Sequence, residues 1–321
     1  MGNLPKNRVV YDRPFLNSGI DYCGPFYIKE KKHRNRNKEK VYVAVFVCFS
    51  TKAVHFEIVS DLTTDAFLAA LKRFFARRGK SSNLYSDNAT NFQGAKREIK
   101  DLYALLSSQS HNDKVTNSLV NKNVNRHFIP PRSPHFVGLW ESAVKSLKYH
   151  LTRVIGNNLL TFEVLLTYVT EIEAILNSRP LTPLSPDPND LNTLTPSHFL
   201  IGDVLTSIPE HDIRQLPSGR LSSWQHVEQM RQHFWNRWYK EYLHEQTVRK
   251  KWHTGSTKDL KIGTLVTVKE DNIPPMHWAL GRIVAIHPDN EGVIRVVTVK
   301  TARGEYKRSV KKISPLPIDI E

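Results

Sequence analysis

The sequence predicts an α/β protein with a mixed sheet flanked by helices, followed by a small β-barrel. Short β-rich runs alternate with helical periodicity in the first half of the chain, and short strands separated by turns fill the segment after residue 263. Between them lies a segment with helical spacing. With 321 residues and 40% hydrophobic content, the chain is long enough for roughly two domains.

Three consecutive strands open the predicted sheet. Residues 19–28 and 41–49 are apolar and rich in β-branched or aromatic side chains, and residues 53–59 alternate inward and outward. Residues 29–40, with seven Lys or Arg against two Glu, form the loop between the first two strands. That loop is either a solvated hairpin tip, or a basic patch that contacts phosphates or serves as a nuclear-import signal.

Helices and single strands follow. Thr63 or Thr64 can cap a helix that Gly79 ends, and the polar stretch 108–123 predicts a loop. The other predicted elements are a strand at 83–86, a helix to about 107, a strand at 126–129, and helices at 139–151 and 162–176.

The C-terminal half has a different pattern. Residues 178–219 are rich in Pro, Asp, Asn and Ser and predict a linker, and residues 222–246 predict a helix that either packs on its own chain or also helps dimerisation. The strands after residue 263 fit a five-stranded barrel. We predict a core domain over 1–185, a linker with a long amphipathic helix over 186–257, and a barrel over 258–316.

The charge of the chain indicates a polyanionic partner. The 46 Lys and Arg exceed the 31 Asp and Glu by 15, and the pI is about 9.7. Residues 249–312 hold fourteen basic against six acidic residues, so this segment alone carries 14 − 6 = +8. Nucleic acids are natural partners of such a surface.

Several classes of protein are disfavoured. Cys23 and Cys48 are too few for a disulfide framework or a Cys-rich zinc site, so we expect a reducing compartment and no zinc in this chain. The longest apolar run, residues 41–49, is well short of the roughly 18–20 residues that a membrane span requires, so no membrane partner is expected. The N-terminus lacks an apolar signal core.

Three acidic residues stand out by position: Asp21 in the first strand, Asp87 after the fourth, and Glu141 in the first turn of a helix. Each has an ordinary explanation, as a turn residue, an Asx-turn or a partner of the helix dipole. A mixed sheet with strands one and four side by side would bring the two aspartates together, and a nearby helix could add the glutamate. Three close carboxylates stay ionised around cations, and oxygen ligands suit Mg²⁺ or Mn²⁺.

Long motifs in a fixed order carry a resemblance. Asp21 lies in GIDYCGPF, Asp87 in SDNATNFQGA and Glu141 in HFIPPRSPHFVGLWESAVKSLKYHL, followed by EAILNSRPLT and LTPSHFLIG. From Met1 to the barrel, the chain resembles the integrases of BEL/Pao-type LTR retrotransposons, which have a ribonuclease H-like catalytic core and an SH3-like C-terminal domain. The resemblance implies that Asp21, Asp87 and Glu141 are catalytic and bind two Mg²⁺ or Mn²⁺ ions.

The resemblance also implies an activity and its partners. An enzyme of this type trims the 3′ ends of the element and joins them to target DNA by in-line phosphoryl transfer without a covalent protein nucleophile. Double-stranded DNA, a homo-oligomer and a nuclear location are therefore expected. We assign no catalytic role to His226, His233 and His244, which we interpret as packing or surface groups.

Basic and amide side chains near the acids are candidate DNA contacts. Lys145 and Lys148 follow Glu141 by four and seven residues and either grip phosphates or, for Lys145, form an i,i+4 ion pair with Glu141. Asn88 and Asn91 either orient substrate and ligands or form an Asx-turn and a helix cap.

In the barrel, Arg303, Lys307 and Arg308 are the predicted contacts to the DNA backbone, and ordinary surface charge is the alternative.

Integrases of this kind carry a His₂Cys₂ zinc domain ahead of the core, whereas this chain begins close to the core. We therefore expect a fragment or a decayed copy, in which multimerisation and recognition of DNA ends are impaired. A catalytically impaired, transposon-derived DNA-binding protein is the main alternative function. A ribonuclease H acting on hybrids is a third, disfavoured by the long linker and the basic barrel.

Overall fold

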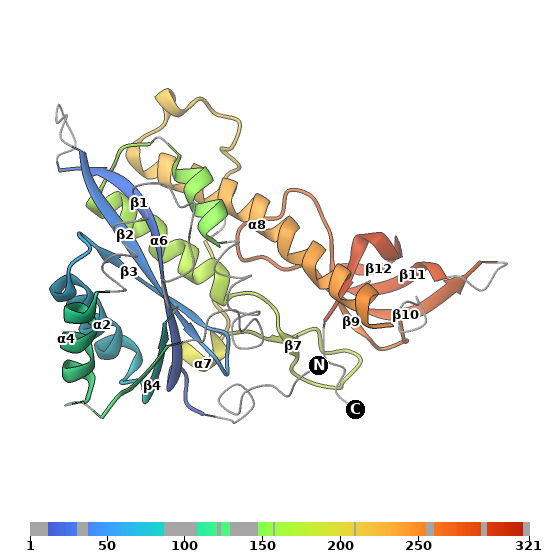
Figure 1. Ribbon diagram of the computed structural model, residues 1–321. Coiled ribbons are helices and arrows are strands. Elements are labelled where there is room, and N and C mark those ends of the chain that lie inside the picture. Colours follow the sequence, from blue (N-terminus) through green and yellow to red (C-terminus); the bar gives the residue numbers. More distant parts are fainter. Residues whose placement is uncertain are drawn as a thin grey trace. The chain divides into compact units, whose positions relative to one another are not determined.

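The computed structural model divides into two compact units, Met1–Leu176 and Asn177–Glu321 (Figure 1). The domain boundaries predicted at residues 185 and 257 stay predictions. The structure describes residues 12–30, 38–86, 108–120, 123–128, 147–156, 158–208, 210–254, 260–289 and 294–316.

A mixed sheet forms the centre of the first unit. Its strands run in the order β3-β2-β1-β4-β5, with β6 beside β1. Strands β1 to β3 are antiparallel neighbours, whereas β4 and β6 run parallel to β1, and β5 parallel to β4. This is the predicted mixed sheet flanked by helices, so the α/β fold class is confirmed, although β6 adds a sixth strand to the five that were predicted. The strands are β1 (Asn17–Lys29), β2 (Lys38–Cys48), β3 (Val54–Val59), β4 (Asn83–Ser86), β5 (Asn125–Phe128) and β6 (Leu160–Thr161).

Helix α2 (Thr64–Arg78) packs on this sheet, as its apolar spacing predicts. The Thr63 hydroxyl accepts a hydrogen bond from the backbone N–H of Ala66, and Gly79 ends the helix at a φ of 81°. Phe74 is fully buried and stacks on Phe46 of β2, with ring centroids 4.0 Å apart. This contact fixes α2 against the sheet.

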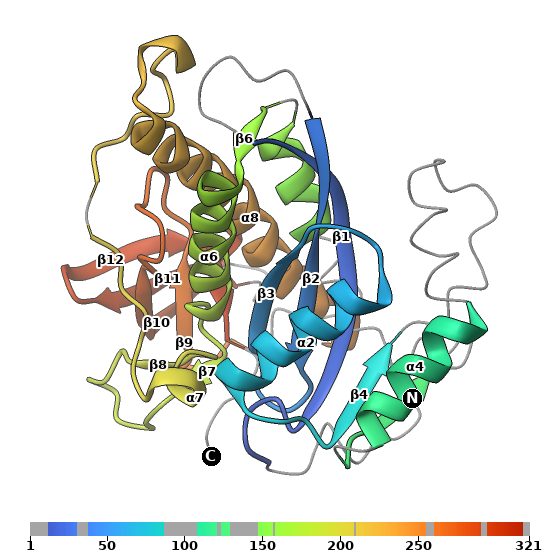
Figure 2. The same cartoon turned by 90° about the vertical axis from the view of Figure 1, so that its left-hand side faces the viewer.

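Helix α4 (Gln109–Val120) occupies a segment predicted as a loop, so that prediction is wrong. His111, Val115 and Leu119 recur every fourth residue and are all buried. Because the Asn, Ser and Asp side chains between them lie on the remaining faces, polar composition concealed a narrow apolar stripe. In Figures 1 and 2, α2 and α4 lie against the same face of the sheet.

The first unit ends in two helical segments. Residues 147–155 are helical, in agreement with the described part of the stripe predicted at 139–151, whose residues 139–146 lie outside the described ranges. Helix α6 (Phe162–Asn177) follows and agrees with the second predicted stripe.

The second unit contains a five-stranded antiparallel sheet, called the C-terminal sheet below, in the order β12-β11-β10-β9-β13. Its core is a cluster of branched aliphatic side chains that includes Val266, Ile283 and Val299. This is the predicted C-terminal β region. Its elements are β9 (Leu265–Val268), β10 (Leu280–Pro288), β11 (Ile294–Thr301), β12 (Gly304–Ser309), the 3₁₀ helix η4 (Val310–Lys312) and β13 (Ile313–Pro315).

Short elements precede this sheet in the predicted linker. They are β7 (Thr182–Pro183), β8 (Thr193–Leu194), α7 (His198–Ile201) and the 3₁₀ helix η2 (Ser218–Arg220).

Helix α8 (Ser223–Thr254) packs on the C-terminal sheet and the segments around it through aromatic side chains. Trp235 and Tyr239 are buried, and Trp278 stands edge-on to Trp235 at 5.1 Å. The Tyr239 hydroxyl donates to the Val268 carbonyl at 3.1 Å. The aromatic face of α8 therefore packs on its own chain. Of the helices in the described ranges, α8 included, none has the length and apolar character needed to cross a membrane.

Candidate active site

Asp21 lies in β1 at the point where the pairing between β1 and β4 ends. It pairs with Val45 of β2, and the preceding residue, Ile20, pairs with Ser86 as the last step of the parallel ladder with β4. In the sequence, Asp87 directly follows Ser86. The pairing of β1 with β4 therefore ends at Ile20 and Ser86, and each of these residues directly precedes a predicted aspartate in the sequence.

Both oxygens of the Asp21 carboxylate accept a hydrogen bond. The ammonium group of Lys148 lies 2.6 Å from Oδ2, and the backbone N–H of Tyr22 lies 2.7 Å from Oδ1. The first contact is a charge-assisted bond of the short, strong kind. Because the two side chains are 32% and 33% exposed, solvent screens their attraction in part.

Lys148 reaches Asp21 from a firmly anchored helix. In the helical residues 147–155, Leu147, Leu151 and Ile155 are buried, and Lys148 stands at the border of that stripe. The sequence predicted Lys148 as a phosphate contact near the acids. The structure places it near one of those acids and shows its ammonium group paired with that carboxylate.

Cys23 lies two residues after Asp21 in the same strand and is buried. Burial raises the pKa of its thiol to about 12, against a smaller lowering by the nearby Lys148 ammonium. The thiol is therefore neutral at physiological pH and a poor nucleophile, since thiolate is the reactive form.

The convergence of the three predicted acids stays a prediction. Within the described ranges, no group of three or more His, Cys, Asp or Glu side chains is arranged to hold a metal ion, and only one of the three predicted ligands, Asp21, falls in those ranges. The predicted site residues outside the described part of the chain are Asp87, Glu141, Asn88, Asn91 and Lys145.

The predicted DNA contacts of the C-terminal sheet lie on and beside its edge strand, β12. Arg308 pairs with the buried Val297, and Lys307 pairs with the next residue of β11. Because neighbouring side chains of a strand point to opposite faces, Lys307 and Arg308 project from opposite faces of β12. The Arg308 guanidinium lies 5.1 Å from the centre of the Tyr306 ring, whose hydroxyl donates to the Arg303 carbonyl at 3.0 Å.

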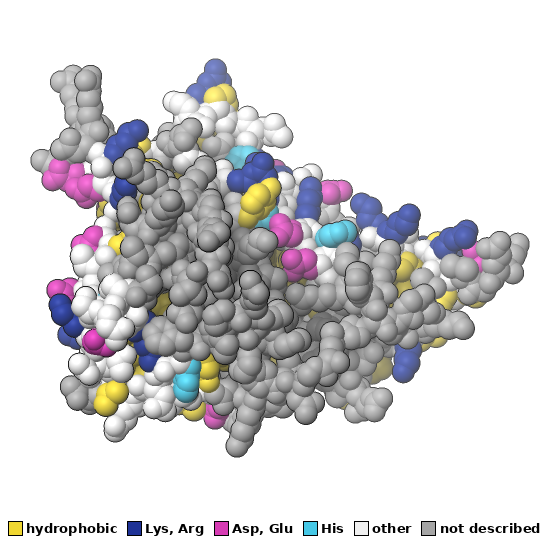
Figure 3. All heavy atoms as spheres, in the orientation of Figure 1, with side chains coloured by type: hydrophobic (Ala, Val, Ile, Leu, Met, Phe, Trp, Pro, Cys, Tyr) yellow, Lys and Arg dark blue, Asp and Glu magenta, His cyan; other side chains and the backbone are white. Residues whose placement is uncertain are grey.

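The Arg308 side chain and the Arg303 backbone carbonyl thus both contact Tyr306, whereas Lys307 points to the other face of β12. In Figure 3, Lys and Arg side chains recur along the part of the surface formed by α8 and the C-terminal sheet.

A buried charged network at β3, called the His55 network below, was missed by sequence reasoning. His55 Nε2 lies 3.0 Å from Glu57 Oε1, and His55 Nδ1 lies 3.3 Å from Glu173 Oε1 of α6. Arg78 donates to Glu173 at 2.5 Å, and Arg73 donates to Glu57 at 2.6 Å. The network therefore links β3 to both α2 and α6.

Opposing effects set the ionisation of this network. Burial alone would lower the pKa of His55, but hydrogen bonds and charge from Glu173 and Glu57 raise it above its usual value. Burial would raise the pKa of Glu57, but His55 and Arg73 together lower it. The only sequence signal was a pair of polar residues inside the strand VHFEIV, which the alternation of a half-exposed strand would also explain.

Comparisons with known proteins match part of the chain to a family and the whole chain distantly to a solved structure. Residues 222–316 match the model of a family described as "Family of unknown function (DUF5641)". A comparison with the curated proteins finds no match. The chain also resembles a chain of the "CryoEM structure of simian T-cell lymphotropic virus intasome in complex with PP2A regulatory subunit B56 gamma". That alignment has 13% identity and a TM-score of 0.37, and it covers 100% of this chain and 85% of that one.

Proposed function

We propose that the protein is a metal-dependent polynucleotidyl transferase of the integrase type. In this proposal it trims the 3′ ends of a mobile element and joins them to target double-stranded DNA. The position of Asp21 carries the proposal, since it lies one residue beyond the last pair of β1 and β4 and beside the Lys148 ammonium at 2.6 Å. The order of the motifs around Asp21, Asp87 and Glu141 supports the same reading.

The donor set fits a hard divalent cation. The Asp21 carboxylate already has a cation beside it, the Lys148 ammonium, and it is partly open to solvent. Asp21, Asp87 and Glu141 would hold Mg²⁺ or Mn²⁺, which favour oxygen ligands. Two such ions would activate the attacking hydroxyl and stabilise the departing 3′ oxygen.

The described residues around Asp21 hold its carboxylate in position and place a positive charge beside it. The Tyr22 N–H and the pairing of Asp21 with Val45 fix the carboxylate on a central strand. Lys148 supplies a positive charge beside it, where a DNA phosphate would gain from it. Cys23 is neutral and adds no competing charge.

Joining of labelled DNA ends in the presence of Mn²⁺ tests this function. We expect metal-dependent products from the wild-type chain and none from the Asp21→Asn or Asp87→Asn variants. Asp113→Asn is a matched control, because Asp113 is an exposed carboxylate on α4 and is not one of the predicted site residues. Equal product yields from the wild type and both site variants would rule the proposal out.

A DNA-binding protein without turnover is the second candidate, and the net charge of +8 over residues 249–312 favours it. This second candidate function predicts that DNA affinity falls steeply with salt, because binding to phosphates releases counterions. It also predicts that no metal-dependent products form. In either case we propose double-stranded DNA as the partner, assembly as a homo-oligomer and a nuclear location.

A further inference from the structure

A row of stacked rings crosses the central sheet of the first unit beside Asp21. Tyr85 of β4 lies between Phe49, which directly follows β2, and His127 of β5. The ring centroids of Phe49 and Tyr85 are 4.8 Å apart, and those of Tyr85 and His127 are also 4.8 Å apart, with an interplanar angle of 18° for the second pair. The three rings therefore form one continuous stack, called the aromatic row below.

The register of the parallel strands places the aromatic row on the same face of the sheet as Asp21. Gly19 of β1 pairs with Tyr85, and Tyr85 pairs with His127, so these three positions share one face. Asp21 follows Gly19 by two residues, and residues two apart in a strand point to the same side. The neighbouring Tyr22 points to the other face, where its ring packs toward α2. The row and the Asp21 carboxylate thus lie on the face opposite α2.

The spacing along the strands suits a nucleotide. Two residues of a strand rise by roughly 6.5–7 Å, so the aromatic row lies one such step from the Asp21 carboxylate. This step is comparable with the separation of a phosphate group from the base of the same nucleotide. A nucleotide whose phosphate is held at Asp21 can therefore place its base at the level of the row.

The two ends of the aromatic row differ in exposure. Phe49 and Tyr85 are half-buried, whereas His127 is exposed and belongs to β5, which ends the strand order of the sheet. One face of the imidazole is stacked on Tyr85, and the other face is turned away from the row. A further flat ring can therefore extend the row at His127.

Amide side chains accompany the row one step further along the strands. Asn17, Asn83 and Asn125 are paired in register across β1, β4 and β5. The Asn83 amide donates to Asn17 Oδ1 at 2.7 Å, and His127 Nε2 lies 2.9 Å from Asn83 Oδ1, which orients the imidazole. Asn125 is exposed and donates to Asn83 Oδ1 only at 3.5 Å. Its amide is therefore weakly held and can turn to the edge of a base.

We propose that the exposed imidazole of His127 stacks on an unpaired base of the DNA strand whose phosphate is held at Asp21. Every base has a π-face, so the contact tolerates any sequence, and Asn125 adds a hydrogen bond to the edge of the base. The inference rests on the proposed function for the choice of DNA as the substrate. It adds a nucleotide-binding residue to that function, and it requires the DNA end to open, because a base reaches the row only after leaving its pair.

Removal of the base tests the contact. The probe is a labelled duplex with a short unpaired 3′ overhang that ends in a 3′-deoxynucleotide and so cannot be joined. It is prepared with and without bases in the overhang. Fluorescence anisotropy with the full chain should show that His127→Ala weakens binding of the base-bearing overhang about tenfold, as expected for one lost stacking contact. The same variant should bind the abasic overhang as the wild type does, and equal weakening with both probes would overturn the inference.

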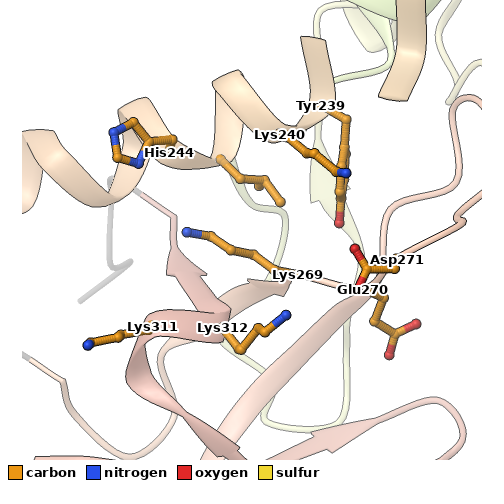
Figure 4. Close-up of a pocket in the computed structure, with 9 residues that line it drawn as sticks. Tyr239, Lys240, His244, Lys269, Glu270, Asp271, Lys311 and Lys312 are labelled. Carbon is orange, nitrogen blue, oxygen red and sulfur yellow. The ribbon is translucent and has the colours of Figure 1, made fainter. Parts of the chain in front are cut away.

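Two further variants separate stacking from other effects. His127→Phe keeps a flat ring and should still bind the base-bearing overhang more tightly than the abasic one, as the wild type does. If His127→Phe behaves like His127→Ala, the contact is polar and the inference is wrong. His244 of α8 is also exposed and lines a pocket of about 300 Å³ in the second unit (Figure 4). His244→Ala is the matched control, and any change that it causes should be the same for the two probes.

A fluorescent base reports stacking without reference to affinity. 2-Aminopurine in the overhang loses fluorescence when it stacks on another ring. At saturating protein, the wild type should quench it, and His127→Ala should leave it bright. Equal quenching by the two proteins would contradict the proposed contact.

These results separate the inference from the proposed function. If His127→Ala treats both overhangs as the wild type does while Asp21→Asn still abolishes joining, the stacking inference fails alone. If His127→Ala loses affinity only for the base-bearing overhang but the wild type yields no metal-dependent product, the proposed catalysis fails alone.

Discussion

The ammonium of Lys148 lies 2.6 Å from the Asp21 carboxylate, so the proposed catalytic carboxylate is already neutralised by a side chain of its own chain. A divalent ion bound at Asp21 would compete with this ammonium. Lys148 would then be released to bind a DNA phosphate. Both its observed partner, Asp21, and its predicted partner, phosphate, are explained in this way.

The Lys148→Ala variant should bind Mn²⁺ more tightly than the wild type, because a competing positive charge is removed. It should nevertheless join less DNA, since it can no longer hold a phosphate at this position. Calorimetric titration with Mn²⁺ in the absence of DNA measures the first effect independently of activity. Lys148→Arg keeps the charge and serves as the control, and unchanged Mn²⁺ affinity in Lys148→Ala would contradict the competition.

Unfolding of the first unit should depend on pH through the His55 network. The pKa of His55 is raised from 6.5 in the folded state, so its stabilisation is complete below 6.5 and is lost as pH rises through the folded pKa. The pKa of Glu57 is lowered from 4.5, so its stabilisation is complete above 4.5 and is lost as pH falls through the folded pKa.

Thermal unfolding of the wild type and of His55→Gln, followed from below pH 4.5 to well above pH 6.5, measures this dependence. The wild type should lose stability as pH rises beyond 6.5, and His55→Gln should lose much less over that range. Parallel curves for the two proteins would show that His55 does not set the dependence.

Gly281→Ala should destabilise the C-terminal sheet by about 1–3 kcal/mol through overpacking. A Cβ at this position would lie 2.5 Å from the Cγ1 of Val299 and 2.8 Å from the carbonyl oxygen of Lys300. Gly219→Ala is the matched control, because no atom lies within 4 Å of its added Cβ. Denaturant unfolding compares the two, and similar midpoints would contradict the packing argument.

The opposite faces of β12 predict unequal roles for its basic residues. If one flat DNA surface meets this strand, the single variants Arg308→Gln and Lys307→Gln should weaken binding to different extents. Fluorescence anisotropy with a labelled duplex, measured over a range of salt, gives the slope for each variant. Identical slopes per removed charge would indicate that DNA meets both faces.

The sheet and the long helices were predictable because their apolar spacing is continuous. Residues 41–48 of β2 are all buried, and such a run allows few other structures. The α4 helix was not predicted, because only His111, Val115 and Leu119 mark its buried face among polar neighbours. The spacing of apolar residues does not indicate a helix clearly when only one residue in each turn is buried.

Asp21 could be identified from its motif, but its partner could not. Lys148 follows it by 127 positions, and only the fold brings the two together. The His55 network was missed for the same reason, since it gathers residues from segments far apart in the sequence. The spacing of residues within one segment does not indicate contacts between distant segments.

The family match over residues 222–316 begins one residue before α8 and ends one residue after β13. Within these limits, Tyr239 and Leu243 of α8 share hydrogen bonds with Val268 and Ser314 of the sheet. Without the helix, the C-terminal sheet would lose the hydrogen bond from Tyr239 to Val268, and the apolar surface that α8 covers would be exposed. Helix α8 and the C-terminal sheet therefore stabilise each other, and the family match spans both of them.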